Sequence, residues 1–435
     1  MATTATQLIT EDMKKRWDPI LEHKNLPKIT NSYKKRVTTI LLENQSNFLG
    51  EAAPTTNTAG IQNWDPVLIS LVRRSTPQLM AFDIAGVQPM TQPTGLIFAM
   101  RSHYNSQPDV TAGNVDHNTG EALQDEADTD FTGTGTHAGT DPVEGADPFG
   151  TAFTTGTGRT GASGEALGDG VGDDFNEMTF TIDKTSVEAK TRALKAEYTR
   201  EMAQDLKNVH GLDAESELSN ILSTEILAEI NREFVRTIYT GAKLGAQKDT
   251  ATSGVFDLDV DSNGRWSAEK YKGLRFQIER DANAIARDTR RGKGNFVIVS
   301  SDVAAALNMS GSLDSTPKTD LDVDDTGSTF AGTMGNLRVY IDPYFSASGH
   351  EFYCVGYKGP SPFDAGIFYT PYIPLEMVKA VGENTFQPKM AFKTRYGIVA
   401  NPFVVDGSGV PIGQNILTNE RLNQYYRIVR VDNLL

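Results

Sequence analysis

The segment from residue 105 to 175 most constrains what this 435-residue chain can fold into, because it has little to pack. It holds fourteen Asp and Glu against one Arg, a net charge of −13, and fourteen of the 39 glycines. Like charges keep such a segment extended, with the repulsion screened beyond about 8 Å at physiological salt. We interpret it as a projecting loop or insertion that becomes ordered against neighbours. Plain disorder without a role is the alternative.

The rest of the chain is close to neutral, since the total charge is −15. No apolar run of about 18 residues occurs, so no membrane span is expected, and the first ten residues do not resemble a secretory signal. The single cysteine, Cys354, rules out an internal disulfide framework and fits a reducing cytoplasm. An acidic chain repels phosphate, so sequence-specific binding to duplex DNA is not expected. A container for packed DNA would have the same charge balance.

Residues 1–51 form a second distinctive segment, in which basic and acidic side chains alternate along a predicted helical stretch. Scattered apolar residues interrupt the charges, among them Trp17, Ile20 and Leu21. Such a segment can form an amphipathic helix but cannot bury a core by itself. It is interpreted either as a solvated tail or as a detachable interaction segment.

The clearest secondary structure follows the acidic segment. Alternating Met178, Phe180 and Ile182 predict a strand, and a short helix is expected around 193–207. Asp213 is the predicted N-cap of a helix that reaches Tyr239. About 25 helical residues span roughly 37 Å, so this helix is expected to be a spine. Its apolar stripe consists of Leu218, Ile221, Leu222, Ile226, Leu227, Ile230, Phe234 and Ile238.

The remaining elements indicate an α+β fold. Asp65-Pro66 predicts a helix start, 96–100 predicts a strand, and apolar spacing predicts a helix from Tyr271 to Ile285. The two last strands are expected to return to the part of the chain built around the spine helix. The strands expected after residue 290 are 296–300, 337–341, 351–355, 366–370, 376–381, 389–400 and 425–431.

No catalytic motif is present. The sequence has no G-x-S-x-G, H-E-x-x-H, P-loop or C-x-x-C pattern, and its six histidines lack partners at metal-ligand spacing. Cys354 lies in an apolar strand and is predicted to be a buried, inert thiol. We therefore expect no catalytic residue, metal or cofactor, and no enzyme activity. A hydrolase is the least favoured reading, because a nucleophile–base pair is missing.

Two short patterns allow more than one interpretation. RRGKG at 290–294 could hold an anion, but an exposed loop tip is preferred. DVDSNG at 259–264 matches the first half of an EF-hand loop, yet its twelfth position is Lys270 where a bidentate Glu is required. An Asx-rich surface turn is the preferred interpretation there.

Two longer stretches resemble a known family. Residues 65–101, which begin DPVLISLVRRSTPQLMAFDIAG, and 180–233, which begin FTIDKTSVEAKTRALKAEYTRE, are similar to the major capsid proteins of T-even tailed phages and their cyanophage relatives. The similarity is looser over the C-terminal third and weakest in 105–175. It implies the Hong Kong 97 type capsid fold, with an N-terminal arm, an extended loop, a peripheral domain that carries the spine helix, and an axial domain. The acidic Gly/Thr-rich segment would be an insertion in that fold.

The resemblance also implies domain boundaries. They are 1–51 for a cleavable propeptide, 52–100 for the N-arm and start of the peripheral domain, 101–182 for the extended loop and acidic insertion, 183–264 for the peripheral domain, 265–385 for the axial domain, and 386–435 for strands that return to the peripheral domain.

Members of this family are trimmed by a phage protease after a Leu/Ile-x-Glu triplet. The triplet Leu49-Gly50-Glu51, followed by Ala52, lies where the charged segment ends. Two other triplets, Leu41-Leu42-Glu43 and Leu227-Ala228-Glu229, also fit, but the latter would lie within the spine helix. Position therefore selects cleavage between Glu51 and Ala52.

The implied function is a structural one. The chain would form hexameric capsomers of an icosahedral or prolate phage head, made in the bacterial cytoplasm and ending in the virion. Its partners would be other copies of itself, the scaffold and protease, and the vertex, portal and decoration proteins; it would enclose double-stranded DNA without reading its sequence. The alternatives are the pentameric vertex paralogue of the same fold and a surface decoration or adhesion protein.

Overall fold

The computed structural model describes residues 11–22, 29, 31–52, 79–104, 122, 127, 129–136, 154–168, 175–176, 178–262, 266–311, 313, 329–344, 350–361, 363–406 and 410–434. The chain divides into two compact units. The first comprises Met1–Ile97, Thr185–Asp406 and Pro411–Leu435, and the second comprises Phe98–Lys184 with Gly407–Val410. The predicted helix at Asp65 and most of the acidic segment lie outside the described residues.

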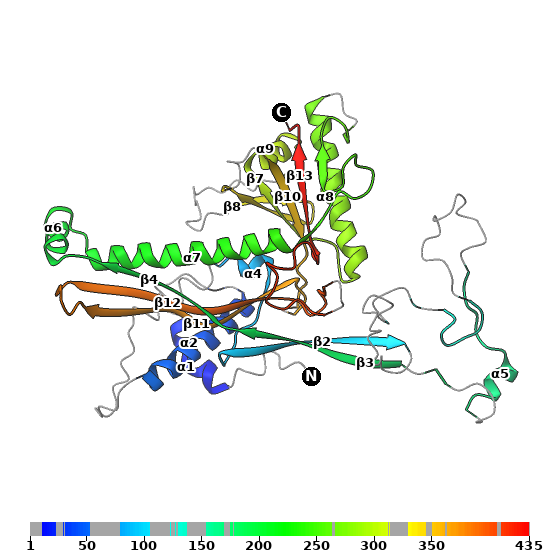
Figure 1. The fold of residues 1–435 in the computed structure, drawn as a ribbon, viewed down its shortest axis with the longest axis horizontal. Helices are drawn as coiled ribbons and strands as arrows, with labels where there is room; N and C mark the ends of the chain where they lie inside the picture. The colour runs from blue at the N-terminus through cyan, green and yellow to red at the C-terminus, as the bar shows by residue number, and fades with distance from the viewer. Residues whose placement is uncertain are drawn as a thin grey trace. The chain divides into compact units, whose positions relative to one another are not determined.

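A four-stranded sheet and a long helix form one part of the first unit. The strands, in spatial order, are β1 (Gly86–Val87), β11 (Ile367–Val381), β12 (Pro388–Ala400) and β4 (Lys190–Glu197). Helix α7 (Ala214–Gly241) runs beside β4 and β12 (Figure 1). Its buried side chains recur every four residues, which keeps one face of the helix toward the sheet. They include Leu222, Ile226, Ile230, Phe234 and Ile238.

A seven-stranded sheet forms the other part of the first unit. Its path is β5 (Ala242–Leu244), β13 (Asn423–Asp432), β10 (Glu351–Gly356), β7 (Phe296–Ser300), β9 (Leu337–Asp342) and β8 (Thr329–Met334), with β6 (Val255–Asp257) paired to β13. Helices α8 (Ser267–Thr289) and α9 (Ser301–Met309) pack against it. Every residue of β7 is buried, as expected for a central strand covered on both faces.

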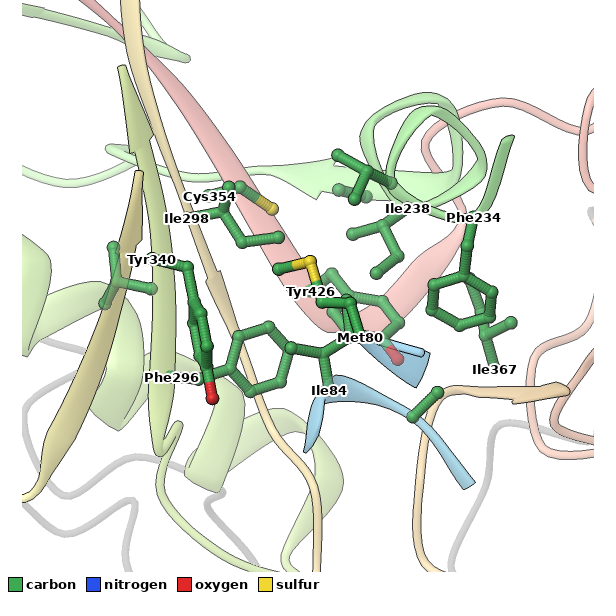
Figure 2. Close-up of a cluster of buried hydrophobic side chains, with 14 of the residues drawn as sticks. Met80, Ile84, Phe234, Ile238, Phe296, Ile298, Tyr340, Cys354, Ile367 and Tyr426 are labelled. Atoms are coloured by element: carbon green, nitrogen blue, oxygen red, sulfur yellow. The ribbon is translucent and has the colours of Figure 1, made fainter. Parts of the chain in front are cut away.

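One continuous apolar core joins these two parts. Figure 2 shows side chains from α7 and from both sheets converging around the short helix α4 (Ala81–Ile84). Cys354 lies in this cluster, fully buried as predicted, and burial raises the pKa of its thiol far above the usual value. The thiol is therefore protonated and inert. The labelled members are Met80, Ile84, Phe234, Ile238, Phe296, Ile298, Tyr340, Cys354, Ile367 and Tyr426.

Two N-terminal helices also belong to the first unit. They are α1 (Glu11–Leu21) and α2 (Ser32–Ala52), and together we call them the N-terminal hairpin. Trp17 and Leu21 of α1 pack on Leu42 of α2 in a small cluster of their own. Helix α2 in turn packs against β11. The hairpin does not build a large core by itself, because Val37 and Leu41 of α2 pack into the main core of the first unit.

The second unit contains most of a two-stranded sheet, formed by β2 (Thr94–Tyr104) and β3 (Met178–Glu188). The described residues of this unit also include the short helix α5 (Gly161–Glu165), which begins at the N-cap Thr160. Thr134 and Thr157 form an isolated antiparallel bridge. These three features hold the part of the acidic segment that the structure describes.

Most of the elements predicted from periodicity are confirmed, including the spine helix, the strand at Met178 and the helix at Tyr271. Asp213 occupies the N-cap of α7 as predicted, although its side chain makes no capping hydrogen bond. The strands expected at 366–370 and 376–381 are one long strand, β11, with irregular pairing after Pro371.

One expectation is wrong. The helix predicted over 193–207 begins only at Arg200, as α6 (Arg200–His210), and the residues before it form β4. Pairing with β12, in which Leu194 lies opposite Phe392, overrides the local helix propensity of this stretch. Of the two last strands, β12 lies in the sheet beside the spine helix, whereas β13 pairs with β10 in the seven-stranded sheet and also contacts α7.

Candidate cleavage site and assembly surfaces

The predicted cleavage site lies at the end of a helix. Leu49, Gly50, Glu51 and Ala52 are the last four residues of α2, which ends at Ala52, and only their backbone is described. Proteases bind their substrates in extended form, so a helical bond must first unwind. Helix ends open locally at the lowest free-energy cost. The Glu51–Ala52 bond therefore lies where unwinding of the helix costs the least free energy.

The two competing triplets lie in less accessible places. In the first, Leu41 and Leu42 are 2% and 1% exposed, and the Glu43 carboxylate accepts a hydrogen bond from Trp17 Nε1 at 2.6 Å. In the second, Leu227 is buried in the middle of α7, and Glu229 is bound by Arg192 at 3.0 Å. Cutting at either triplet requires disruption of a packed helix, which favours Glu51 among the three.

Arg192 fixes the spine helix to the sheet beneath it. From β4 its guanidinium contacts Glu229 at 3.0 Å and Glu233 at 2.6 Å, and its Nε donates to the hydroxyl oxygen of Tyr396 in β12 at 2.5 Å. Burial alone would lower the pKa of Arg192, but its hydrogen bonds with Glu233 and Tyr396 raise the pKa above its ordinary value. The arginine stays charged and connects three elements.

Asp342 connects the same helix to the seven-stranded sheet. Its Oδ2 accepts hydrogen bonds from Arg232 at 2.7 Å and from the Tyr239 hydroxyl at 2.8 Å. Its Oδ1 accepts from the backbone N–H of Tyr344 at 3.1 Å. Burial, and then the negative charge of Asp342, raises the pKa of Tyr239, so the hydroxyl remains a donor. A buried carboxylate satisfied by three donors fixes the angle at which α7 meets the sheet.

The second unit exposes a row of large apolar side chains. They occupy alternate positions, so within each strand they point to one face. Their exposed fractions lie between 45% and 67%, unusual for residues of this size in strands. An apolar surface of this kind indicates a contact with another protein chain. The residues are Phe98 and Met100 of β2 and Met178, Phe180 and Ile182 of β3, and we call them the apolar ribbon.

The two ambiguous sequence patterns have structural explanations. Asp257 Oδ1 accepts from the backbone N–H of Asp259 at 2.8 Å, which forms an Asx turn, and Lys270 pairs with Asp259; Asn263 and Gly264 lie outside the described residues. The basic turn at 290–294 is less exposed than expected, because Arg291 stacks over the Phe403 ring at 4.4 Å. Among the described residues, no cluster of three or more His, Cys, Asp or Glu could hold a metal.

Sequence reasoning did not identify the apolar ribbon as an exposed surface, although its signal was present. The alternation that predicted the strand at Met178 placed apolar residues at every second position, on one face of that strand. No helix in the described part of the chain is long and apolar enough to cross a membrane.

Comparison with known proteins gives consistent matches. The family described as Major capsid protein Gp23 matches residues 61–431. A major capsid protein of Salmonella phage ViI is 43% identical over 416 residues, covering 92% of both chains, and that of Enterobacteria phage T4 is 35% identical over 520 residues, covering 96% and 97%. The capsid vertex protein of phage T4 is 28% identical over 242 residues, covering 53% and 54%.

Solved structures also show similarity. A chain from the capsid of Myoviridae phage XM1 aligns with a TM-score of 0.40 at 8% identity, covering 81% of this chain and 92% of that one. A chain from Microbacterium phage Oxtober96 aligns with a TM-score of 0.39 at 10% identity, covering 89% and 99%.

Proposed function

We propose, from the fact that this chain belongs to the Gp23 family of major capsid proteins, that it forms the hexameric capsomers of a tailed-phage head. The role is structural, without catalysis. The relatives that cover most of the chain are all major capsid proteins, which favours the hexamer-forming subunit. The vertex protein of phage T4 covers about half of it at lower identity, so the pentameric paralogue is second.

The apolar ribbon is the observation that carries the assembly role. Covering apolar surface contributes about 25 cal/mol per Å², and a typical specific interface buries about 1,600 Å² in total. The ribbon alone would supply only part of such an interface. Each subunit therefore makes several contacts of modest strength. Because a modest contact can dissociate, a misplaced subunit can leave and rebind before the shell closes.

The proposed fold is of the Hong Kong 97 type. The mixed α+β architecture, the spine helix α7 and the separation of a second unit support it. In this layout residues 101–182 form the extended loop with its acidic insertion, 183–264 the peripheral domain and 265–385 the axial domain. Residues 52–100 form the N-arm. Strand β11 belongs to the four-stranded sheet beside α7, and β13 belongs to the seven-stranded sheet. The boundaries of this layout are therefore adjusted, so that β11 is assigned to the peripheral domain and β13 to the axial domain.

Maturation is proposed to remove residues 1–51. The position of Glu51 at the end of α2, and the burial of the two competing triplets, support cleavage there. Scaffold and protease would act on the chain before this step, in the bacterial cytoplasm. Vertex, portal and decoration proteins complete the shell of the virion, and the acidic chain encloses DNA without reading its sequence.

A surface decoration or adhesion protein is a weaker candidate. It would place the acidic segment outside the shell as a binding module. The match of the family over residues 61–431, which includes both sheets and the spine helix, favours the shell subunit.

The assembly role is tested by expressing the full chain alone and with its scaffold, then examining the products by sedimentation and electron microscopy. Hexamers, or shells and tubes built from them, are expected. Pentamers under all conditions would support the vertex paralogue, and a stable monomer that binds preformed heads would support the decoration protein.

A further inference from the structure

The N-terminal hairpin occupies an apolar groove on the first unit. Val37 and Leu41 of α2 are 0% and 2% exposed and belong to the main core. Leu41 lines a small cavity with residues from α4, α7 and β11. Most of those residues belong, with Leu41, to the main core. We call them the apolar groove: Leu79, Phe82, Leu227, Tyr369, Ile373 and Leu375.

Polar contacts fix the position of α2 in the groove. The Asn44 side-chain amide donates to the carbonyl oxygens of Met90 at 2.7 Å and Tyr372 at 3.0 Å. At the other end of the helix, the Lys34 ammonium lies 3.8 Å from Asp83 and 5.4 Å from the centre of the Phe82 ring. These contacts specify one register and orientation, so the groove is fitted to this helix.

One buried side chain works against this binding. Gln45 follows Leu41 by one helical turn on the same face and is 2% exposed. Neither its amide nitrogen nor its amide oxygen has a hydrogen-bond partner among the described residues. Burying an unsatisfied amide is unfavourable. The interface thus combines a closely packed apolar contact with one unsatisfied buried amide, which destabilises it.

We propose that, when the chain is cut at Glu51, the N-terminal hairpin first stays bound non-covalently in the apolar groove, and that Gln45 weakens this contact so that the hairpin then dissociates in a separate step. The proposal rests on the cleavage proposed above. While the chain is intact, the covalent link keeps the hairpin at a high effective concentration beside the groove. The cut removes that advantage, so hydrolysis and exposure of the groove become two separate steps.

The test uses the full chain with a recognition sequence for a sequence-specific protease inserted between Ala52 and Ala53. After cutting, size-exclusion chromatography at several dilutions measures how much of the 1–52 fragment stays with the body. The fragment is expected to co-elute at micromolar concentration and to separate on dilution. Immediate and complete loss at every concentration would overturn the proposal.

Matched variants in α2 locate the effect. Gln45→Met keeps the size and helix propensity of the side chain but removes the unsatisfied amide, so release should slow by about tenfold. Leu41→Ala and Asn44→Ala should accelerate release, and Arg36→Ala, on the exposed face of α2, should not change it. If Gln45→Met releases the fragment as fast as Arg36→Ala does, Gln45 does not control release.

Thermal melting of each uncut variant identifies any that fail to fold. If Leu41→Ala does not fold, Asn44→Ala takes its place as the variant that weakens the contact. Because the cut is engineered, the result does not depend on where the phage protease acts. Natural particles that start elsewhere than Ala52 would contradict the proposed maturation but not the retention of the hairpin. A fragment that never binds would contradict only the retention.

Discussion

At the scale of single residues, two polar side chains, one buried and one partly exposed, decide how the parts of the first unit are joined. Asp342, the last residue of β9 in the other sheet, binds Arg232 and Tyr239 of the spine helix. Lys358 extends toward α4 and donates to the carbonyl oxygen of Phe82. Neither contact was predictable from sequence, because each joins residues more than 100 positions apart, and no local pattern identifies such partners.

Replacing Arg232 by Ala should destabilise the chain markedly. The Asp342 carboxylate would remain buried with a charged partner missing, and removing one member of a buried ion pair costs about 3–5 kcal/mol. Because Arg232 is about a quarter exposed, we expect the lower part of that range. Arg236→Ala, one turn further along the exposed face of α7, should change the free energy of unfolding by less than about 0.5 kcal/mol. Urea denaturation of the unassembled chain measures both, and equal effects would contradict the account.

Lys358 should make stability rise with pH above 8. Burial, together with the positive charges of Arg338 and Lys34 and against the opposing effect of Asp83, lowers its pKa to about 8. Below that pH the lysine is protonated in both states. Between pH 8 and its unfolded pKa of about 10.4, the unfolded chain binds the extra proton, so the free energy of unfolding increases with pH, by about 1–3 kcal/mol in total.

The variant Lys358→Met isolates this contribution. Its stability should lack the rise that the parent chain shows between pH 8 and 10, while other titrating groups affect both chains equally. Denaturation curves at pH 7, 8, 9 and 10 make the comparison, and parallel pH profiles for the two chains would show that Lys358 does not titrate as inferred.

At the scale of elements, periodicity predicted those whose partners are local and missed those set by distant pairing. The spine helix has a stripe that recurs every four residues, so Leu222 to Ile238 identified it from sequence alone. Strand β4 was assigned as helix because ALKAE has helical propensity, and only the β12 partner makes it a strand. The sequence of the N-terminal hairpin indicated that it cannot bury a core by itself. It did not reveal where Val37 and Leu41 pack, because the groove that receives them is formed by residues far along the chain.

The apolar ribbon should be required for assembly but not for folding. Phe180→Glu places a charge on its exposed face, so hexamer and shell formation should be lost while the melting temperature of the unassembled chain changes little. Thr179→Glu, on the opposite face of β3, is the matched control. Sedimentation of both variants tests the ribbon, and normal shells from Phe180→Glu would show that this surface is not an interface.

At the scale of the whole molecule, the two units differ in how they bury apolar surface. The first has a continuous core through both sheets and covers a groove with its own N-terminal hairpin. In the described part of the second unit, the apolar ribbon and Phe175 are exposed. This division agrees with the membership of the chain in a capsid protein family. Family membership was predictable from residues 65–101 and 180–233, whereas the cover over the groove was not.

The most direct test of this account is the intact mass of the chain in fast-sedimenting particles from an infected-cell lysate. The account predicts particles of phage-head size that contain a chain starting at Ala52, and Glu51→Ala should leave residues 1–51 attached. A full-length chain found only in small soluble fractions would contradict both the shell role and the maturation at Glu51.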